Sequence, residues 1–528
     1  MRLLASAMFP EILLCAIACV LFLMGISNKP VVRKFAPVLA ILALLIAGFS
    51  QLGMFAGKDP FTDRWNTIYI SEFARYIKLL SAAMGVLLLL LAWPSNERGT
   101  GGNAMDFASE GCEFYALMLL SIAGIFIVAG ASDIMLLFLG IELASIPTYI
   151  MVSISRPLPV AQEAGLKYFF LGAMAAAIML FGFSYLYGTT GTTKLSEIEA
   201  MMRPSHLSPW QMLALVMLIA GFAFKMAVVP LHVYAGDVYQ GAATPVTAFL
   251  SFVPKTAGFV ALLKVLYAVS GGTWAVPPEI VHLLAWLAVL TMTIGNVLGL
   301  VQIANIKRVF AYSSIAHSGY MLVGVTALVS TRNPEIQDTA LAGVLFYLTA
   351  YGLMNIGVFG TLILLPSRQN TPATSAETFD DLAGQGRKHL LLGLAMAVSC
   401  FSLIGLPLTV GFFGKLYLIA PALQAGLNWL VVFLVINAAI SAAYYLKIVA
   451  ALFLRAEPVR PRFGTTPAPV DAPIHHPFPV LLSVGVSMVG VLWLGIVLPA
   501  TSRLTDRTAK AAQLESVSTV IESPITQR

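Results

Sequence analysis

Ionisable side chains lie deep inside several long apolar stretches of this sequence. Glu142, Lys225 and Lys415 each stand well away from the nearest polar connection. Such a group costs about 2.5–3.5 kcal/mol at the centre of a membrane helix, so other groups must compensate for it. Burial disfavours the charged form of a lysine and a nearby carboxylate favours it, so a lysine beside a movable acid can load and unload a proton. We therefore predict a chain of proton-transfer residues: Glu142, Lys225, Lys255, His317 and Lys415.

The surroundings of Lys225 indicate a break in its helix. Pro230 lacks a backbone donor, and its ring tends to kink or end a helix. A broken helix at mid-membrane exposes backbone groups that tolerate ions or protons. His232 would share a face with Lys225 if the helix continued past the proline. A lysine that merely extends its stem to water is the alternative, but Lys225 is far from both ends of its apolar stretch.

Two further lysines stand close to prolines. Lys255 follows Pro254 directly, near the middle of its apolar stretch. Pro407 and Gly411 precede Lys415 at intervals of four residues, so a weakened helical face leads to this amine. We therefore expect a second broken helix there.

Structural explanations compete with the functional one for some of these residues. Ser145 and Tyr149 lie on the same helical face as Glu142 and are local hydroxyls that could hold the acid. His317 suits a proton relay because histidine titrates near neutral pH, but a purely hydrogen-bonded role is also open. Lysines nearer the ends of their stretches are expected to anchor helices at the membrane surface. The secondary candidates are His232, Lys264 and Lys447.

The elements that must position these residues are membrane helices. The chain is 59% hydrophobic and only 11% charged, against about 25% charged in soluble proteins. An α-helix satisfies its backbone hydrogen bonds within its own segment, as a lipid environment requires. The predicted fold class is therefore an all-α polytopic membrane bundle. Spans 7 and 12 are the two expected to be broken. We predict about fourteen spans, at 9–27, 36–55, 76–94, 112–131, 133–153, 164–187, 210–234, 241–268, 280–301, 308–329, 340–366, 390–420, 428–454 and 478–500.

The basic residues report on topology rather than on nucleic acid. The net charge of +6 is scattered over short connections and helix ends. Connections from odd- to even-numbered spans carry more Lys and Arg than the opposite side, which places both termini outside, facing the periplasm of a bacterium. The polar connections 95–111, 367–389 and 455–477 are too short for a soluble catalytic domain, and we expect 371–386 to be a flexible cytoplasmic loop.

Motifs for redox cofactors are absent from the sequence. There is no G-x-G-x-x-G after a strand, no P-loop and no C-x-x-C. The cysteines show no metal-ligand spacing and are interpreted as passive core thiols: Cys15, Cys19, Cys112 and Cys400. Any redox chemistry that drives this chain must therefore take place elsewhere.

At these residues the sequence resembles a known family, the N subunits (NuoN type) of proton-pumping NADH:quinone oxidoreductase. The similarity runs from about residue 112 to 454, and the segment Asp237-Val-Tyr-Gln-Gly is its most specific part, because related antiporter-like subunits differ there. The stretches that carry it are 163–172, 224–232, 237–250, 305–317 and 411–415.

The resemblance implies a fold, a set of residue roles and partners. The fold has fourteen helices with two inverted five-helix repeats, so that 1–111 holds three N-terminal helices, 112–279 the first repeat, 280–456 the second, and 457–528 the last helix and a tail. In this family a glutamate matching Glu142 pairs with a lysine matching Lys225. Lysines matching Lys255 and Lys415 and a histidine matching His317 lie on the hydrated axis. The complex is a translocase of the bacterial inner membrane whose FMN, iron-sulfur clusters and quinone are bound by other subunits, with no redox site in this chain.

Two other functions are consistent with buried lysines in broken helices. A cation/proton antiporter subunit of the Mrp type would share both features, although the Asp237-Val-Tyr-Gln-Gly segment argues against it. A membrane scaffold whose buried charges are inert ion pairs would share them too.

Overall fold

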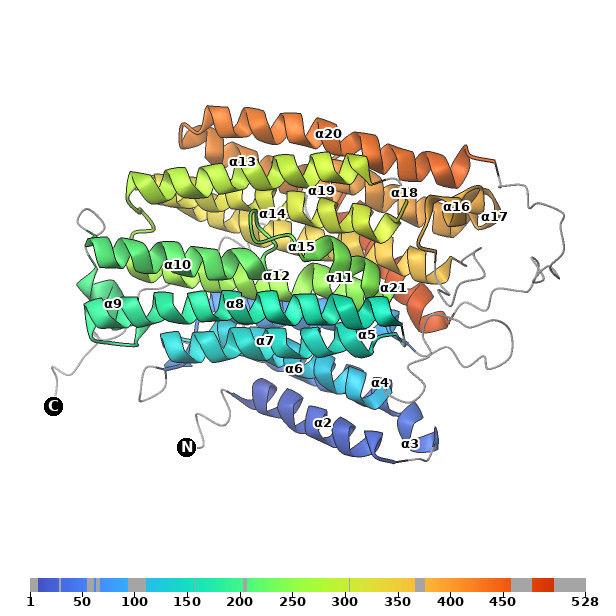
Figure 1. The fold of residues 1–528 in the computed structure, drawn as a ribbon, viewed down its shortest axis with the longest axis horizontal. Coiled ribbons are helices and arrows are strands. Elements are labelled where there is room, and N and C mark those ends of the chain that lie inside the picture. Colours follow the sequence, from blue (N-terminus) through green and yellow to red (C-terminus); the bar gives the residue numbers. More distant parts are fainter. Residues whose placement is uncertain are drawn as a thin grey trace.

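The protein is a bundle of long, roughly parallel helices (Figure 1). The computed structural model describes residues 8–27, 30–54, 61–62, 67–93, 111–156, 158–202, 207–302, 304–365, 376–456 and 477–497. Ten helices in these ranges are long and apolar enough to cross a membrane, and three shorter apolar helices lie among them. The predicted all-helical membrane fold is therefore confirmed. The expected connections 95–111 and 455–477 and the tail from 501 lie almost wholly outside the described residues.

The N-terminal part contributes three long helices. They are α2 (Phe9–Gly25), α4 (Ala36–Met54) and α5 (Glu72–Leu91), and the short α3 (Pro30–Lys34) lies between the first two. A small antiparallel pair, β1 (Phe61–Thr62) and β2 (Tyr69–Ile70), precedes α5. Ser71 caps α5 by accepting a hydrogen bond from the Ala74 amide, so the helix begins at a defined residue.

Three long helices and one short helix follow in the chain. They are α6 (Gly111–Gly130), α7 (Ile134–Ile154), α8 (Pro159–Thr190) and the short α9 (Leu195–Met201). Asp133 caps α7 through its side chain. Gly124 of α6 lies so close to the Ala144 backbone of α7 that a Cβ there would be 2.3 Å from the Ala144 nitrogen. This close approach packs α7 tightly against α6.

The seventh predicted span is broken, but not where the proline suggested. The helix α10 (Pro209–Lys225) ends at Lys225 itself, and a second short helix, α11 (Ala235–Gly241), follows a turn. Residues 235–240 were expected to be a connection and are helical, and α12 (Thr244–Val269) begins after two intervening residues. Because the helix does not continue past Pro230, His232 does not share a helical face with Lys225 as the spacing had suggested.

Three helices form the centre of the bundle. These are α12, α14 (Ile306–Ser330) and α15 (Pro334–Leu364), while α13 (Pro278–Val301) covers α14 on one side. The apolar core segments of α12 and α15 are completely buried inside the protein. Helices that are enclosed by other helices can carry polar groups away from lipid, and the proposed proton-transfer residues Lys255 and His317 are on α12 and α14.

The last part contains the second break. After α16 (Phe379–Leu382) and α17 (Gln385–Lys388), the chain bends by 119° into α18 (Leu390–Ile404). Residues 405–409 interrupt the helix before α19 (Val410–Gln424), so Pro407 lies in a gap and not on a weakened helical face. Gly405, at φ +89°, makes the turn that ends α18. The remaining helices are α20 (Asn428–Phe453) and α21 (Phe478–Ile496).

The segment expected to be a flexible loop is partly folded. Its described portion, 376–386, includes α16 and the first half of α17. Thr378 and Asp381 form a reciprocal capping box at the start of α16. Glu377 is anchored between basic residues of other elements. The prediction rested on composition alone, which does not reveal such long-range ion pairs.

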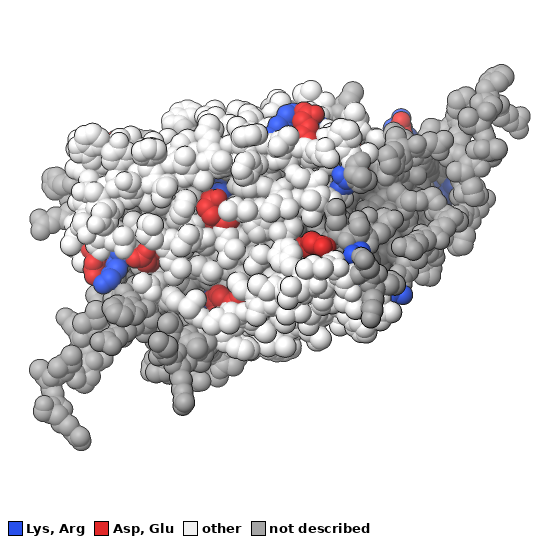
Figure 2. All heavy atoms as spheres, turned by 60° about the horizontal axis from the view of Figure 1, so that its bottom comes forward, with Lys and Arg blue, Asp and Glu red and all other residues white. Residues whose placement is uncertain are grey.

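The two ends of the bundle have different connections. The connections between α6 and α7, α12 and α13, and α14 and α15 lie at the end where α9 packs, which we call the α9 end. At the opposite, α16 end lie α16, α17 and the starts of α12 and α14 (Figure 1). On the face drawn in Figure 2, most of the described surface is uncharged, with few acidic or basic side chains. An uncharged surface between two ends is what a bilayer requires.

Candidate functional site

Glu142 and Lys225 form an ion pair inside the bundle. The Lys225 Nζ lies 3.0 Å from Glu142 Oε1 and donates to the Tyr149 hydroxyl at 3.1 Å. The Lys225 side chain is 2% exposed and that of Glu142 17%. Ser145, a hydroxyl that could have held the acid locally, instead donates to the Ile141 carbonyl. An acid on α7 and an amine on α10 therefore meet away from water.

The break after Lys225 is lined by groups that satisfy its free backbone. The Val229 amide donates to the Thr291 hydroxyl at 3.2 Å, and the Met226 carbonyl accepts from the Ser318 hydroxyl at 2.6 Å. Unpaired backbone groups are costly in a membrane interior, so these contacts from α13 and α14 allow the helix to end there. The fold thus places Lys225 at a helix terminus in the middle of the protein.

Lys255 is held by hydroxyl, carbonyl and aromatic groups of neighbouring helices. Its Nζ donates to the Ser314 carbonyl and, at 2.9 Å, to the Ser318 hydroxyl. It also lies 5.4 Å from the centre of the Tyr351 ring, an arrangement that favours a cation. Since Ser318 also donates to the Met226 carbonyl, one hydroxyl joins Lys255 to the turn that follows Lys225.

A small cavity separates the first two lysines. Its volume is about 10 Å³, the lower limit of what one water molecule requires. A single water there would lie between two amines and several tyrosines. Its lining consists of Tyr168, Lys225, Ala227, Tyr234, Val238, Tyr239, Leu250, Pro254 and Lys255.

His317 joins α14 to two other helices through two tyrosine hydroxyls. Its Nδ1 lies 2.7 Å from the hydroxyl of Tyr347 on α15, and its Nε2 lies 3.1 Å from that of Tyr445 on α20. The ring is fully buried. Because imidazole and phenol can each donate or accept, this three-residue chain can pass a proton by exchanging hydrogen bonds.

Lys415 is bound by the end of the helix that precedes its own. Its Nζ donates to the carbonyls of Leu403 and Ile404, at 3.1 and 2.8 Å. These are terminal carbonyls of α18, which have no acceptor role within the helix and carry its negative dipole end. The amine also lies 4.7 Å from the centre of the Tyr320 ring. Among the described residues no carboxylate pairs with Lys415.

The five predicted residues are thus joined through neighbouring side chains in one path through the bundle, which we call the line. Lys255 and His317 both pack against the ring of Tyr351. Glu142 and Lys225 are in direct contact, and Ser318 and the small cavity lie between Lys225 and Lys255. Tyr320 lies between the last two, because it packs edge-on at 5.3 Å against the ring of His317 and lies beneath the amine of Lys415. The line runs from α7 to α19.

The secondary candidates lie off this line. His232 is in the turn between α10 and α11, and its Nδ1 is buried with no hydrogen-bond partner among the described residues. Lys264 was expected to anchor at the membrane surface, but it is buried and donates to the Ala131 carbonyl at 2.7 Å. Lys447 is exposed near the α16 end, and its amine lies 5.0 Å from the centre of the Phe379 ring.

Two groups of polar residues could not be identified from the sequence. The tyrosines that hydrogen-bond to His317 stand on other helices, and nothing in their spacing could have shown that they converge on it. Glu377 contacts Arg156 and, at 2.8 Å, Lys307, which also donates to the Ala242 carbonyl at the start of α12. Burial alone would raise the pKa of Glu377, but the two cations outweigh it and hold the pKa below its ordinary value. This cluster ties the chain before α16 to the base of the first broken helix.

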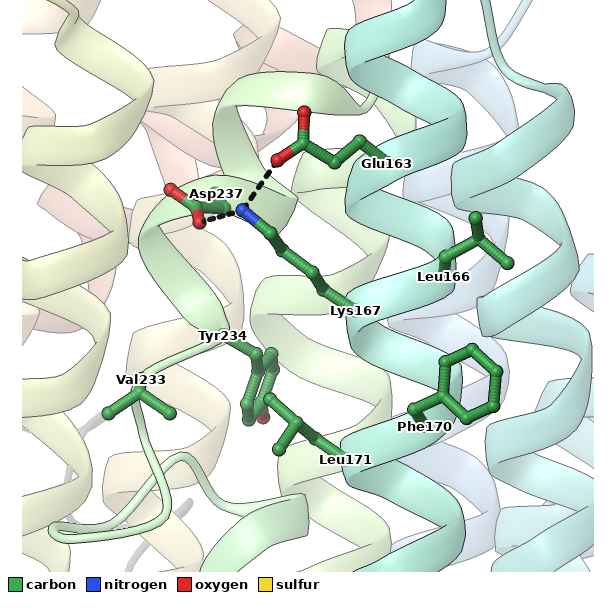
Figure 3. A pocket seen from close by; sticks show the side chains of 8 residues that line it. All are labelled: Glu163, Leu166, Lys167, Phe170, Leu171, Val233, Tyr234 and Asp237. Atoms are coloured by element: carbon green, nitrogen blue, oxygen red, sulfur yellow. Dashed lines mark hydrogen bonds and ion pairs between the residues drawn. The ribbon is translucent and has the colours of Figure 1, made fainter.

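A second charged cluster lies on the outer side of that broken helix. Figure 3 shows Lys167 of α8 between the carboxylates of Glu163 and Asp237, at 2.7 and 2.9 Å. Arg308 of α14 pairs with the other Asp237 oxygen at 3.0 Å. These residues border an open groove of about 540 Å³ whose remaining lining is largely apolar. Both α8 and α14 therefore hold α11 in place through Asp237.

Comparisons with known proteins give a consistent result. Residues 131–441 match the family model described as "NADH:quinone oxidoreductase/Mrp antiporter, TM". The NADH-quinone oxidoreductase subunit N of Trichlorobacter lovleyi is 35% identical over 458 residues, which is 85% of this chain and 88% of that protein.

Solved structures share the fold over nearly the whole chain. One chain of respiratory complex I from Thermus thermophilus with bound aureothin is 31% identical, with a TM-score of 0.73 and coverage of 93% of this chain and 97% of that one. A chain of the Mrp complex from Dietzia has a TM-score of 0.77 and coverage of 97% and 99%, but at 19% identity it shows the fold alone.

Proposed function

This chain belongs to the NADH:quinone oxidoreductase/Mrp antiporter family, and we propose that it is the antiporter-like N subunit of a proton-pumping NADH:quinone oxidoreductase. It is a multi-pass protein of a bacterial membrane, and its partners are the other subunits of that complex. The observation that carries the proposal is the buried Glu142–Lys225 ion pair at the broken helix, from which a line of polar groups continues to Lys415.

Proton transfer along the line follows from the contacts. Lys225 gives up its proton when Glu142 moves away, since the ammonium then loses the carboxylate that stabilises it. The proton passes by the small cavity to Lys255, then by the tyrosine-bound imidazole of His317 to Lys415. The secondary carriers in this proposal are His232, Lys264 and Lys447.

The topology of the proposed subunit follows the same family. It comprises fourteen spans, with three N-terminal helices in 1–111, inverted repeats in 112–279 and 280–456, and a last helix and tail in 457–528. Both termini, and with them the α9 end, face the periplasm. FMN, the iron-sulfur clusters and the quinone are bound by other subunits, and this chain holds no redox site.

Two measurements test the proposal. Purification of the tagged chain is expected to co-isolate flavin- and iron-sulfur-containing subunits that oxidise NADH. Sodium transport by an assembly without redox cofactors would instead support an Mrp-type antiporter, whose fold this chain shares.

Variants of the ion pair distinguish a pump from a scaffold. Lys225→Ala or Glu142→Ala is expected to lower NADH-driven proton pumping in vesicles while the complex still assembles. Lys34→Ala, which removes an exposed lysine on α3, is the control and should pump normally. Normal pumping by an assembled Lys225→Ala complex would favour an inert scaffold.

A further inference from the structure

A second buried ion pair lies outside the line of proposed carriers. Glu11 is in the first turn of α2 and Lys78 is within two turns of the start of α5, and their charged atoms are 2.5 Å apart. The two side chains are 6% and 1% exposed. The second carboxylate oxygen of Glu11 is buried without a hydrogen-bond partner among the described residues. A charged pair in an apolar helix is costly and is a functional candidate by default.

A third ionisable group meets this pair at the end of α6. The Lys264 amine, from α12, donates to the Ala131 carbonyl at 2.7 Å. The Lys78 amine lies 3.7 Å from where a Cβ would stand at the adjacent Gly130. Two lysines from different helices thus converge on one helix terminus, and Glu11 pairs with one of them. We call Glu11, Lys78 and Lys264 the outer cluster.

The outer cluster repeats the chemistry of the Glu142–Lys225 site. In both places an acid on one helix pairs with a lysine on another, and a lysine of α12 is held nearby by a backbone carbonyl. Lys255 and Lys264 are nine residues apart, so they lie about 14 Å apart along α12. One fully enclosed helix therefore supplies an amine to each site.

The position of the outer cluster indicates which water it can reach. Lys264 stands five residues before the end of α12 at Val269, about 8 Å along the helix axis. The backbone next to Ala131 is hydrogen-bonded to other segments at the same end of the bundle. The Ser132 amide donates to the Thr67 carbonyl, and the Leu195 amide, at the start of α9, donates to the Ser132 carbonyl. The cluster thus lies just beneath the α9 end of the bundle.

We propose that the outer cluster is an additional proton-exchange site, which connects α12 to the water at the α9 end. Lys78 passes a proton to Glu11 across their hydrogen bond and takes one from the Lys264 ammonium, which becomes a neutral amine. Glu11, now a carboxylic acid, releases its proton to water. The cluster as a whole gives up one proton, and no other reactant is needed. This inference rests on the proposed pumping function.

Arginine substitutions separate proton exchange from a purely structural role. Arginine keeps the positive charge and the hydrogen bonds but does not deprotonate in proteins. In the intact complex reconstituted into vesicles, Lys78→Arg and Lys264→Arg are each expected to slow NADH-driven proton translocation about a hundredfold, the lower end of the range for loss of an acid–base group. Proton translocation at the wild-type rate by either variant would overturn the proposal.

Neutral variants provide the second test. The double variant Glu11→Gln/Lys78→Gln retains a hydrogen-bonded pair without charge, so a merely structural pair would tolerate it. We expect it to pump as poorly as the single Glu11→Gln variant, and recovery of wild-type pumping in the double variant would count against proton exchange. Glu279→Gln, an exposed acid in the first turn of α13, is the control for loss of a carboxylate.

A parallel measurement on Lys225→Gln keeps the two hypotheses distinct. If Lys225→Gln fails to pump while all outer-cluster variants pump normally, only the outer cluster is wrong. If Lys225→Gln and the outer-cluster variants all pump normally, the proposed function itself fails.

Discussion

The two broken segments each present a buried lysine, but different groups hold the two amines. Lys225 is the last residue before its break and is paired with the carboxylate of Glu142. Lys415 follows its break and is bound by two carbonyls at the end of α18. A full negative charge stabilises the first ammonium, whereas only partial charges stabilise the second.

This difference indicates different tasks for similar elements. The proton affinity of a lysine that is paired with an acid changes when the acid moves. The first broken segment can therefore respond to a shift of α7 against α10. A lysine held by a helix end responds to a change of the break itself. We infer that the first segment is controlled by an ion pair and the second by backbone geometry.

The largest expected effect comes from removing the acid of the first segment. Glu142→Gln leaves Lys225 buried without a carboxylate, and breaking a buried pair costs about 3–5 kcal/mol. We expect a lower Tm of the purified complex and about a hundredfold loss of proton pumping, the lower end of the range for an acid–base group. Glu163→Gln, an exposed acid paired with Lys167, is the control, with at most about 1 kcal/mol lost. An equal loss in both variants would contradict the special role of the buried pair.

Glu377→Gln tests whether an acid from the C-terminal part of the chain stabilises the part that contains the first broken segment. Glu377 precedes α16, yet it neutralises Arg156, which lies between α7 and α8. Charged hydrogen bonds of this kind contribute about 1.5–3 kcal/mol.

The pH dependence of this contribution has a defined sign. The folded-state pKa of Glu377 lies below its ordinary value of 4.5, so its contribution is present above pH 4.5 and is lost as pH falls below it. The Tm difference between wild type and Glu377→Gln should therefore shrink only below about pH 4.5. A Tm difference that stays constant to the lowest accessible pH would exclude the ion pairs as its source.

Lys415→Gln tests the second segment with a smaller effect on stability. An amide still donates to the carbonyls of Leu403 and Ile404, so we expect only about 1 kcal/mol of destabilisation. Pumping should nonetheless fall, because an amide carries no exchangeable charge. Lys415→Gln should thus lower the pumping rate with little change in Tm, whereas Glu142→Gln should lower both the pumping rate and the Tm. Equal destabilisation of the two variants would remove the distinction between the segments.

Glu199 gives the smallest expected effect. It is the converse case, an acid that has no amine partner among the described residues. Burial raises the pKa of Glu199 on α9 to about 7. Because the folded protein holds the Glu199 proton more tightly than the unfolded chain does, the folded state loses stability as pH rises from the ordinary pKa of 4.5 towards and through 7. Glu199→Gln should raise the Tm by an amount that grows over this range, equivalent to about 1 kcal/mol after solvent screening. No gain at pH 8 would contradict burial as the cause.

The sequence predicted which charged residues lie inside the bundle better than it predicted where the helices break. Glu142, Lys225 and Lys255 were selected because charge within an apolar stretch needs compensation, and the fold does bring them together. The positions of the helix breaks were less predictable. Pro230 and Pro407 indicated breaks nearby, but α10 ends at Lys225 and the second gap spans 405–409. A helix ends where neighbouring helices satisfy its free backbone groups, and Thr291 and Ser318 do this from far along the chain.

The sequence by itself determined the membrane class, the helical fold and the buried charges, because apolar length and the cost of a charge in lipid are local properties of a stretch. Only the tertiary structure decided which partner each charge has. It gave Lys225 an acid, Lys415 two carbonyls and His317 two tyrosines, and it placed Glu11 beside Lys78. These contacts join residues on different helices, and the packing that aligns the helices is set by the whole bundle.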